Sequence, residues 1–190
     1  MHLIIKNMVC PRCITSVEQL LEQHKLKAKS VRLGEVELLK EPSKRQLQKF
    51  AESLKQTGFE LLDDQKSKQI EQVKNLLIQK VQSENIEDHF RLSKFITDHI
   101  YKDYSSISKL FSEVEGMTIE QYFILQKIEK AKELLFYKEE SLNEISFRLG
   151  YSSVAHLSAQ FKKITGMTPS QFKKPGTARR QSIDEVGVKV

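Results

Sequence analysis

The residues best suited to chemistry in this 190-residue chain are its only two cysteines, Cys10 and Cys13, which are separated by two residues. Thiols at this spacing can bind a soft metal ion or interconvert with a disulfide. In a reducing compartment either role is commoner than a structural crosslink. Soft sulfur ligands select Cu(I) or another soft ion, whereas tetrahedral zinc needs further ligands, for which His2 and His24 are weak candidates.

A second candidate for binding is a stretch of the C-terminal half that carries only positive charge. The chain has a formal net charge of +6. Residues 145–183 contain seven Lys or Arg residues and no acid, whereas residues 83–144 contain 8 basic and 13 acidic residues. Because Lys and Arg can displace the counterions condensed on phosphates, the stretch favours a nucleic-acid ligand. A solvated charged face is the alternative interpretation.

The sequence contains no arrangement of residues that predicts catalysis. Its serines lack an evident His/Asp arrangement and there is no phosphate-binding loop, so we do not expect an enzyme. No apolar stretch approaches the roughly 20 residues of a membrane span, and the N-terminus lacks a signal-peptide layout. A cytoplasmic protein with no membrane partner is therefore expected.

The elements that must position the basic stretch contain an internal repeat. Residues 92–123 match residues 142–173 at a constant offset of 50, so that Gly116-Met117-Thr118 recurs as Gly166-Met167-Thr168. Each copy predicts a short helix, a turn, a second helix and a glycine stop. Two helices joined by a tight turn form the unit that inserts its second helix into a DNA major groove. A plain helical hairpin is the alternative, which the presence of two copies disfavours.

The second copy resembles the signature of the AraC family of transcription regulators. The resemblance covers about residues 83–174 and rests on Leu149-Gly150-Tyr151, His156-Leu157-Ser158, Phe161-Lys162 and Thr168-Pro169-Ser170-Gln171-Phe172. It implies an all-helical domain of two helix-turn-helix units joined by a long helix, about Ile119–Phe136. The two units would enter major-groove segments roughly 34 Å apart. It also implies double-stranded DNA as the ligand, RNA polymerase as a partner and action as an activator, although the sequence itself does not separate activation from repression.

Helix geometry selects the side chains that would contact DNA. With Ile107, Phe111 and Val114 turned inward, the first recognition helix directs its polar side chains outward. These match the positions through which family members contact DNA, namely Ser105, Ser106, Ser108, Lys109 and Ser112. The second recognition helix presents Ser153, Ala155, His156, Ser158, Ala159, Lys162 and Lys163. Lys109 favours a guanine edge, whereas Ala159 replaces an arginine common in the family and favours an apolar contact such as a thymine methyl.

The two copies differ in ways that predict different contributions to binding. Ile100 stands where the turn glycine is expected in the first copy, and that half of the domain is acidic. We therefore expect the second copy to supply most of the electrostatic attraction and the first copy to supply mostly register.

The segment around the cysteines resembles the heavy-metal-associated domain of copper chaperones and metal-transporting ATPases. The resemblance covers about residues 1–64 and rests on Met8-Val9-Cys10-Pro11-Arg12-Cys13 and Thr57-Gly58-Phe59. Asn7 replaces the usual glycine, and proline inside the motif is atypical. In that family two thiolates at a helix start, a position that favours ionised sulfur, bind Cu(I). Soft-metal sensing, thiol redox sensing and a domain retained only for its fold remain open.

The order of the elements predicts an α+β chain. Residues 1–64 follow the order βαββαβ of a small ferredoxin-like domain. Residues 65–85 form a linker helix whose apolar stripe suits packing or a homodimer seam, residues 86–174 form the all-α double helix-turn-helix domain, and residues 175–190 form a disordered tail.

Two hypotheses of function follow. The first is a sequence-specific DNA-binding transcription regulator that responds to a soft metal or to thiol redox state. The alternative is a metal-binding or metal-trafficking protein with a helical interaction module. The doubled helix-turn-helix favours the first, because a trafficking protein needs no recognition helices.

Overall fold

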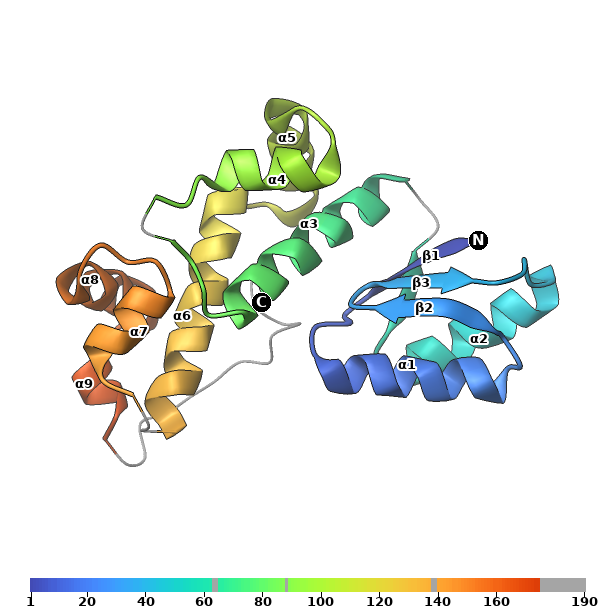
Figure 1. The fold of residues 1–190 in the computed structure, drawn as a ribbon, viewed down its shortest axis with the longest axis horizontal. Coiled ribbons are helices and arrows are strands. Elements are labelled where there is room, and N and C mark those ends of the chain that lie inside the picture. The colour runs from blue at the N-terminus through green and yellow to red at the C-terminus, as the bar shows by residue number, and fades with distance from the viewer. Residues whose placement is uncertain (63–64, 88, 138–139, 175–190) are drawn as a thin grey trace. The chain divides into compact units, whose positions relative to one another are not determined.

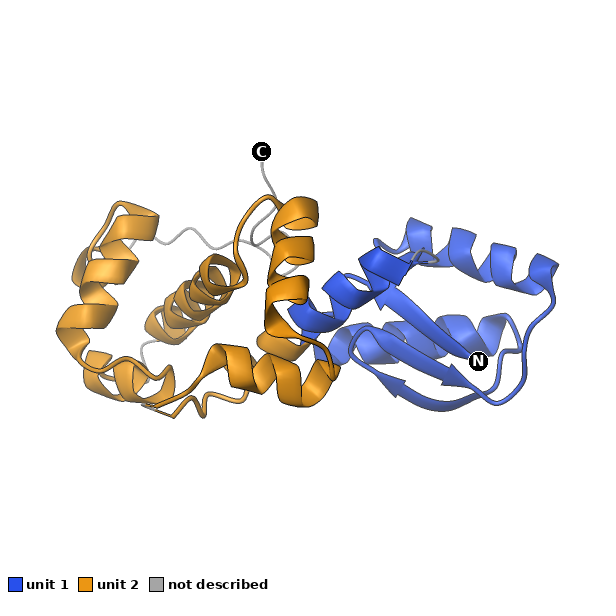
Figure 2. Ribbon diagram, turned by 90° about the horizontal axis from the view of Figure 1, so that it is seen from above, with its two compact units in different colours: residues 1–75 blue, residues 76–190 orange. Residues whose placement is uncertain are grey.

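The computed structural model describes residues 1–62, 65–87, 89–137 and 140–174, so the tail predicted for residues 175–190 lies outside the described residues. The chain divides into two compact units, an N-terminal unit of residues 1–75 and a C-terminal unit of residues 76–190 (Figure 2). The division falls inside helix α3 (Gln65–Gln82), the helix expected as a linker, so this helix contributes residues to both units.

The N-terminal unit has the element order expected from the sequence. It contains β1 (His2–Lys6), α1 (Pro11–Gln23), β2 (Ala28–Arg32), β3 (Glu35–Leu38), α2 (Lys44–Gln56) and β4 (Glu60–Leu62), followed by the first part of α3 (Figure 1). Among the described residues four strands form one sheet in the order β2-β3-β1-β4, with β1 antiparallel to both β3 and β4. The β2–β3 hairpin turns at Gly34, whose φ of 75° lies in the left-handed region that favours glycine.

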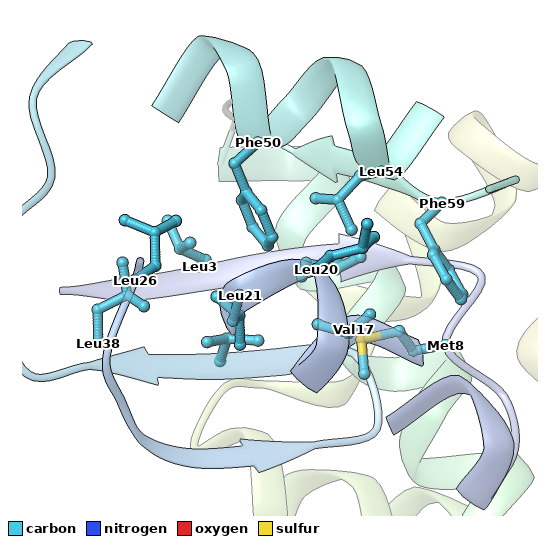
Figure 3. Close-up of a cluster of buried hydrophobic side chains, with 12 residues drawn as sticks. Leu3, Met8, Val17, Leu20, Leu21, Leu26, Leu38, Phe50, Leu54 and Phe59 are labelled. Carbon is cyan, nitrogen blue, oxygen red and sulfur yellow. The ribbon is translucent and has the colours of Figure 1, made fainter. Parts of the chain in front are cut away.

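Both α1 and α2 pack on the same face of this sheet. Leu3 and Ile5 of β1 share one buried cluster with Val17 of α1 and with Phe50 and Leu54 of α2 (Figure 3). Burying an apolar side chain of this size contributes ~2 kcal/mol, so these contacts hold the helices on the sheet. The chain also sets the helix starts, because proline occupies the first turn of α1 and a serine caps α2.

The first part of α3 is anchored to two turns of the N-terminal unit. The backbone amide of Asn7 donates a hydrogen bond of 3.3 Å to Glu71 Oε1. A Cβ atom placed on Gly34 would lie 1.9 Å from Asn75 Nδ2, so the buried Asn75 side chain lies directly against the hairpin turn.

The C-terminal unit continues with α4 (Leu92–Ile100), α5 (Tyr104–Glu115), α6 (Ile119–Tyr137), α7 (Leu142–Arg148), α8 (Val154–Thr165) and α9 (Pro169–Phe172). The offset of 50 holds in the secondary structure as well as in the sequence, since α5 and α8 begin and end 50 residues apart. We call α4–α5 the first helix-turn-helix and α7–α8 the second; α6 joins them. None of the helices in the described part of the chain is long and apolar enough to cross a membrane.

The repeat extends to the packing of aromatic rings. The rings of Phe111 and Tyr122 meet edge to face at 5.6 Å, and those of Phe161 and Phe172 do so at 5.5 Å. The first pair fixes α5 against α6, and the second fixes α8 against α9. Both copies therefore contain the same edge-to-face aromatic contact at equivalent positions.

The turns of the two copies differ by one residue. In the second copy Gly150 takes the left-handed conformation with φ 63°, as expected, but in the first copy Tyr101, and not Ile100, takes it with φ 55°. A β-branched side chain is a poor fit to this region, so α4 continues through Ile100 and the left-handed residue follows it. The expectation that Val114 is buried was wrong, because its side chain is 49% exposed.

Candidate nucleic-acid interface

The start of α5 is organised by a residue that the sequence analysis did not single out, Asp103. Its carboxylate accepts a hydrogen bond of 3.0 Å from the backbone amide of Ser106 and further bonds from the hydroxyls of Ser105 and Ser106. The bond from Ser105, and then that from the Ser106 amide, hold the pKa of Asp103 below its ordinary value. The carboxylate is therefore ionised at neutral pH and already engages two of the predicted DNA contacts. The preference of aspartate for the position before a helix could have revealed it.

The remaining predicted residues of the first helix-turn-helix lie further along α5. Lys109 is exposed, whereas Ser108 and Ser112 are half-buried. Lys109 is thus the cationic group that α5 offers to a ligand, beside two hydroxyls that are partly covered by the protein.

The start of α8 is capped by Ser153, another predicted contact. Ser153 Oγ accepts a hydrogen bond of 3.1 Å from the backbone amide of His156. The His156 ring lies edge-on to the Tyr151 ring at 5.3 Å, and its Nδ1 lies 3.1 Å from Ser152 Oγ. These contacts orient the exposed imidazole, which leaves Nε2 as the ring nitrogen best suited to bind a ligand.

The rest of α8 presents the surface expected from the sequence. Ala155, Ala159, Lys162 and Lys163 are exposed, and Ser158 is half-buried. Lys162 and Lys163 lie in the last turn, where cations also interact favourably with the helix dipole. This surface combines small apolar groups, one imidazole and two ammonium groups.

A lysine of α6 connects the joining helix to the turn of the second helix-turn-helix. Lys127 Nζ lies 3.9 Å from the centre of the Tyr151 ring and 5.5 Å from that of Phe123. Burial lowers the pKa of Lys127 to about 8. Its contacts with aromatic rings make it a packing residue of the C-terminal unit, and no local sequence pattern signals them.

The two cysteines lie together at the start of α1. Cys10 occupies the position before the helix, and its Sγ lies 3.3 Å from Cys13 Sγ; both thiols are free and partly buried. Burial raises the pKa of the Cys13 thiol, contrary to the expectation that the helix start would favour thiolate. Ion binding at this pair would therefore have to displace a proton.

The residues near the cysteines suit a two-coordinate soft ion better than zinc. His2 Nδ1 lies 3.0 Å from Glu35 Oε1, and His24 Nε2 lies 2.8 Å from Ser53 Oγ, so both candidate histidines are engaged elsewhere. Within residues 1–62, 65–87, 89–137 and 140–174 there is no group of three or more His, Cys, Asp or Glu side chains that could hold a metal ion. Two thiols alone can hold Cu(I), which accepts low coordination by soft ligands.

Comparison with known proteins finds similarity in the C-terminal unit. Residues 97–175 match the family model described as "Helix-turn-helix domain". The chain is 38% identical over 69 residues to the xylose operon regulatory protein of Escherichia coli, a match that covers 36% of this chain and 18% of that protein. It is 26% identical over 88 residues to the melibiose operon regulatory protein of the same organism, covering 46% of this chain and 29% of that protein. The chain thus spans less than a third of either relative, and both are regulators, not enzymes.

Solved structures agree in fold. The C-terminal domain of AraT, a response regulator from Geobacillus stearothermophilus, matches with a TM-score of 0.50 and 22% identity, covering 63% of this chain and 92% of that domain. At this identity the likeness concerns the fold alone. It supports the all-helical arrangement of the C-terminal unit.

Proposed function

We propose that this chain, whose residues 97–175 are a helix-turn-helix domain of the AraC type, is a sequence-specific DNA-binding transcription regulator. The observation that carries the proposal is the pair of recognition helices, α5 and α8, which recur at an offset of 50 residues and each expose a polar face. Two such helices in one domain suit adjacent major-groove segments on one face of the duplex, roughly 34 Å apart.

The proposed contacts divide by chemistry. On α8, Lys162 and Lys163 contact phosphates, His156 Nε2 donates to a base or phosphate, and the exposed alanines meet apolar groups such as thymine methyls. Ser153 and Ser158 complete this surface. On α5, Lys109 contacts a guanine edge, with Ser108 and Ser112 beside it. Ser105 and Ser106 take part only by exchanging their bonds to Asp103.

The second helix-turn-helix supplies most of the attraction in this proposal. Residues 145–174 contain no acid, whereas Asp103 stands ionised at the start of α5. A charge of that sign beside a phosphate opposes binding, so the first helix-turn-helix contributes chiefly register.

The test is selection of bound sites by the full chain from random duplex DNA at near-physiological salt. Enrichment of one motif with two segments about a helical turn apart is expected. A chain that enriches no sequence under any salt concentration is not a sequence-specific regulator. Comparison with a non-specific duplex in the same buffer separates sequence readout from charge attraction.

We further propose that the N-terminal unit is a ferredoxin-like domain of the heavy-metal-associated type that senses a soft ion or thiol oxidation at Cys10 and Cys13. The sheet order and the 3.3 Å separation of the two sulfur atoms support this proposal. Titration with Cu(I) against a chromophoric chelator should show one ion bound per chain, and the pair of substitutions Cys10→Ser and Cys13→Ser should abolish binding. If Cu(I) is not bound, alkylation of the thiols before and after mild oxidation tests the redox alternative.

RNA polymerase and a second copy of the chain are the protein partners that we propose for this regulator. Sedimentation at micromolar concentration, with and without the selected duplex, tests self-association. A monomer under both conditions would remove the homodimer from the proposal.

A further inference from the structure

The chain that connects α3 to α4 is attached to the turn of the second helix-turn-helix. The side chain of Ile86 is 5% exposed, and its backbone amide donates a hydrogen bond of 3.1 Å to the carbonyl oxygen of Arg148. A Cβ atom placed on Gly150 would lie 2.5 Å from Ile86 Cγ2 and 2.9 Å from its carbonyl oxygen. Gly150 therefore does more than permit a turn, because the missing side chain is what lets Ile86 approach.

An ion-pair network strengthens the same attachment. Glu84, in the left-handed conformation with φ 52°, places one carboxylate oxygen 2.7 Å from Lys130 Nζ of α6 and the other 2.9 Å from an Arg148 guanidinium nitrogen of α7. Burial alone would raise the pKa of Glu84, but the bonds from Lys130 and Arg148 outweigh it and lower the pKa. Lys130 is paired with both Glu84 and Glu133, and its side chain is only 7% exposed. Because a buried charge is costly without its partners, removing the charge of Glu84 should weaken this contact.

The other end of the connection packs on the first helix-turn-helix. The Phe90 ring lies 5.1 Å from the Phe95 ring of α4 and 5.5 Å from the Phe123 ring of α6. Lys80 Nζ donates a hydrogen bond of 2.6 Å to the Asn85 carbonyl oxygen and lies 5.3 Å from the centre of the Phe90 ring. Figure 1 shows this segment running beside α6 on its way to α4. One short piece of chain thus touches both helix-turn-helix units and the helix between them.

We infer that Glu84, Ile86 and Phe90 form a brace that fixes the second helix-turn-helix relative to the first, and so sets the spacing of the two DNA segments that the chain reads. The inference rests on the proposed DNA-binding function. The brace residues touch no DNA themselves; they act by position. In a duplex, one base pair of altered spacing moves a half-site by about 3.4 Å and rotates it by about 35°. A rigid pair of recognition helices must distinguish such sites, whereas a loosened pair tolerates them.

The test compares variants on a series of duplexes. The duplex selected by the wild-type chain is remade with one base pair inserted or removed between its two segments. We expect the wild-type chain to lose about 10-fold or more in affinity on each altered duplex, since a single misplaced contact costs about that much. Glu84→Gln and Ile86→Ala should lose about 3-fold or less. Glu87→Gln removes the same charge from an exposed neighbouring side chain and should show the wild-type loss of affinity on the altered duplexes. Ile86→Val, which keeps most of the buried side chain, should also show the wild-type loss, unlike Ile86→Ala.

A second measurement does not depend on DNA. Residual dipolar couplings from α4–α5 and α7–α8 should fit one alignment tensor in the wild-type chain and in Glu87→Gln, but two tensors of different magnitude in Glu84→Gln. If Ile86→Ala does not fold, Glu84→Gln, which keeps the shape of the side chain, decides the outcome. A single tensor in Glu84→Gln, or an equal loss of affinity on every spacing, overturns the brace. Failure of the wild-type chain to select any site would instead count against the proposed function, and the couplings would still decide the inference.

Discussion

Lys127 Nζ lies 3.9 Å from the centre of the Tyr151 ring, which places an ammonium group of α6 against the turn of the second helix-turn-helix. The charged form gains from the aromatic face but loses hydration, and burial lowers its pKa to about 8. The packing of this turn therefore depends on the protonation state of Lys127.

The lowered pKa of Lys127 gives a pH dependence of stability with a defined sign. In the unfolded chain this lysine has its ordinary pKa of 10.5, whereas in the folded chain burial lowers its pKa to about 8. The unfolded state binds more protons between these values, so the free energy of unfolding should rise with pH there, by up to ~2 kcal/mol between pH 8 and 9.5. Burial raises the pKa of Tyr151, which lowers stability only above pH 10.

Urea unfolding of Lys127→Met and Lys127→Arg checks this expectation. Both variants should lack the rise between pH 8 and 9.5, because neither side chain titrates in that range. A rise of the same size in Lys127→Met would assign the effect to another group.

Asp103 should limit the affinity of the first helix-turn-helix for DNA. Asparagine caps a helix about as well as aspartate but carries no charge, so Asp103→Asn should bind the selected duplex about 3-fold more tightly at low salt. The gain should shrink as salt is added. Glu113→Gln, on the exposed face of the same helix, is the control for loss of any acid. An equal gain in affinity there would show that the effect does not depend on the position of Asp103. Asp103→Ala should instead cost ~1 kcal/mol of stability through loss of the cap.

Lys162 and Lys163 should dominate the salt dependence of binding. Each phosphate contact contributes about 0.9 to the slope of log affinity against log salt concentration, so Lys162→Gln with Lys163→Gln should lower the slope by up to about 1.8. The same double change at the exposed Lys40 and Lys44 of the N-terminal unit should leave the slope unchanged. Equal slopes for the wild-type chain and the Lys162/Lys163 variant would refute the proposed division between the two copies.

Two glycines of the N-terminal unit offer a test of how α3 is anchored. Gly34→Ala and Gly58→Ala both place a side chain in the left-handed region, at a cost of ~1 kcal/mol each. Only the new Cβ at position 34 meets a neighbour, since nothing lies within 4 Å at position 58. Gly34→Ala should therefore destabilise the chain by about 1 kcal/mol more than Gly58→Ala in urea unfolding. Adding Asn75→Ala should recover part of this difference, and identical costs for the two alanines would show that Asn75 moves aside freely.

Local patterns in the sequence predicted most of the elements. The order βαββαβ expected for residues 1–64 is the order observed, with proline at the start of α1. The joining helix, which the family resemblance implies over about 119–136, is Ile119–Tyr137. The repeat at an offset of 50 is confirmed in the helices. The turn of the first copy was placed one residue too early, because the conformational preference of Ile100 outweighed the alignment.

The candidate interface was predicted less completely, for a physical reason. Helical periodicity identifies which side chains face outward, and it placed Lys109, Lys162 and Lys163 correctly on the surface. It cannot tell whether an outward hydroxyl already has a partner, as Ser105 and Ser106 do in Asp103. The attachment of Ile86 to Arg148 joins residues 62 positions apart and leaves no mark in any local pattern.

The repeat also has a consequence for the DNA. The two copies share their buried rings, their glycine stops and their helix bounds, but α5 presents serines and one lysine where α8 presents alanines, histidine and two lysines. Because the copies follow one another in a single chain, their order cannot be exchanged by rotating the protein. Under the proposed function, the DNA site of one such chain is therefore asymmetric. Inverting that site at a promoter would make the bound protein, and whatever surface it offers to a partner, face the opposite way.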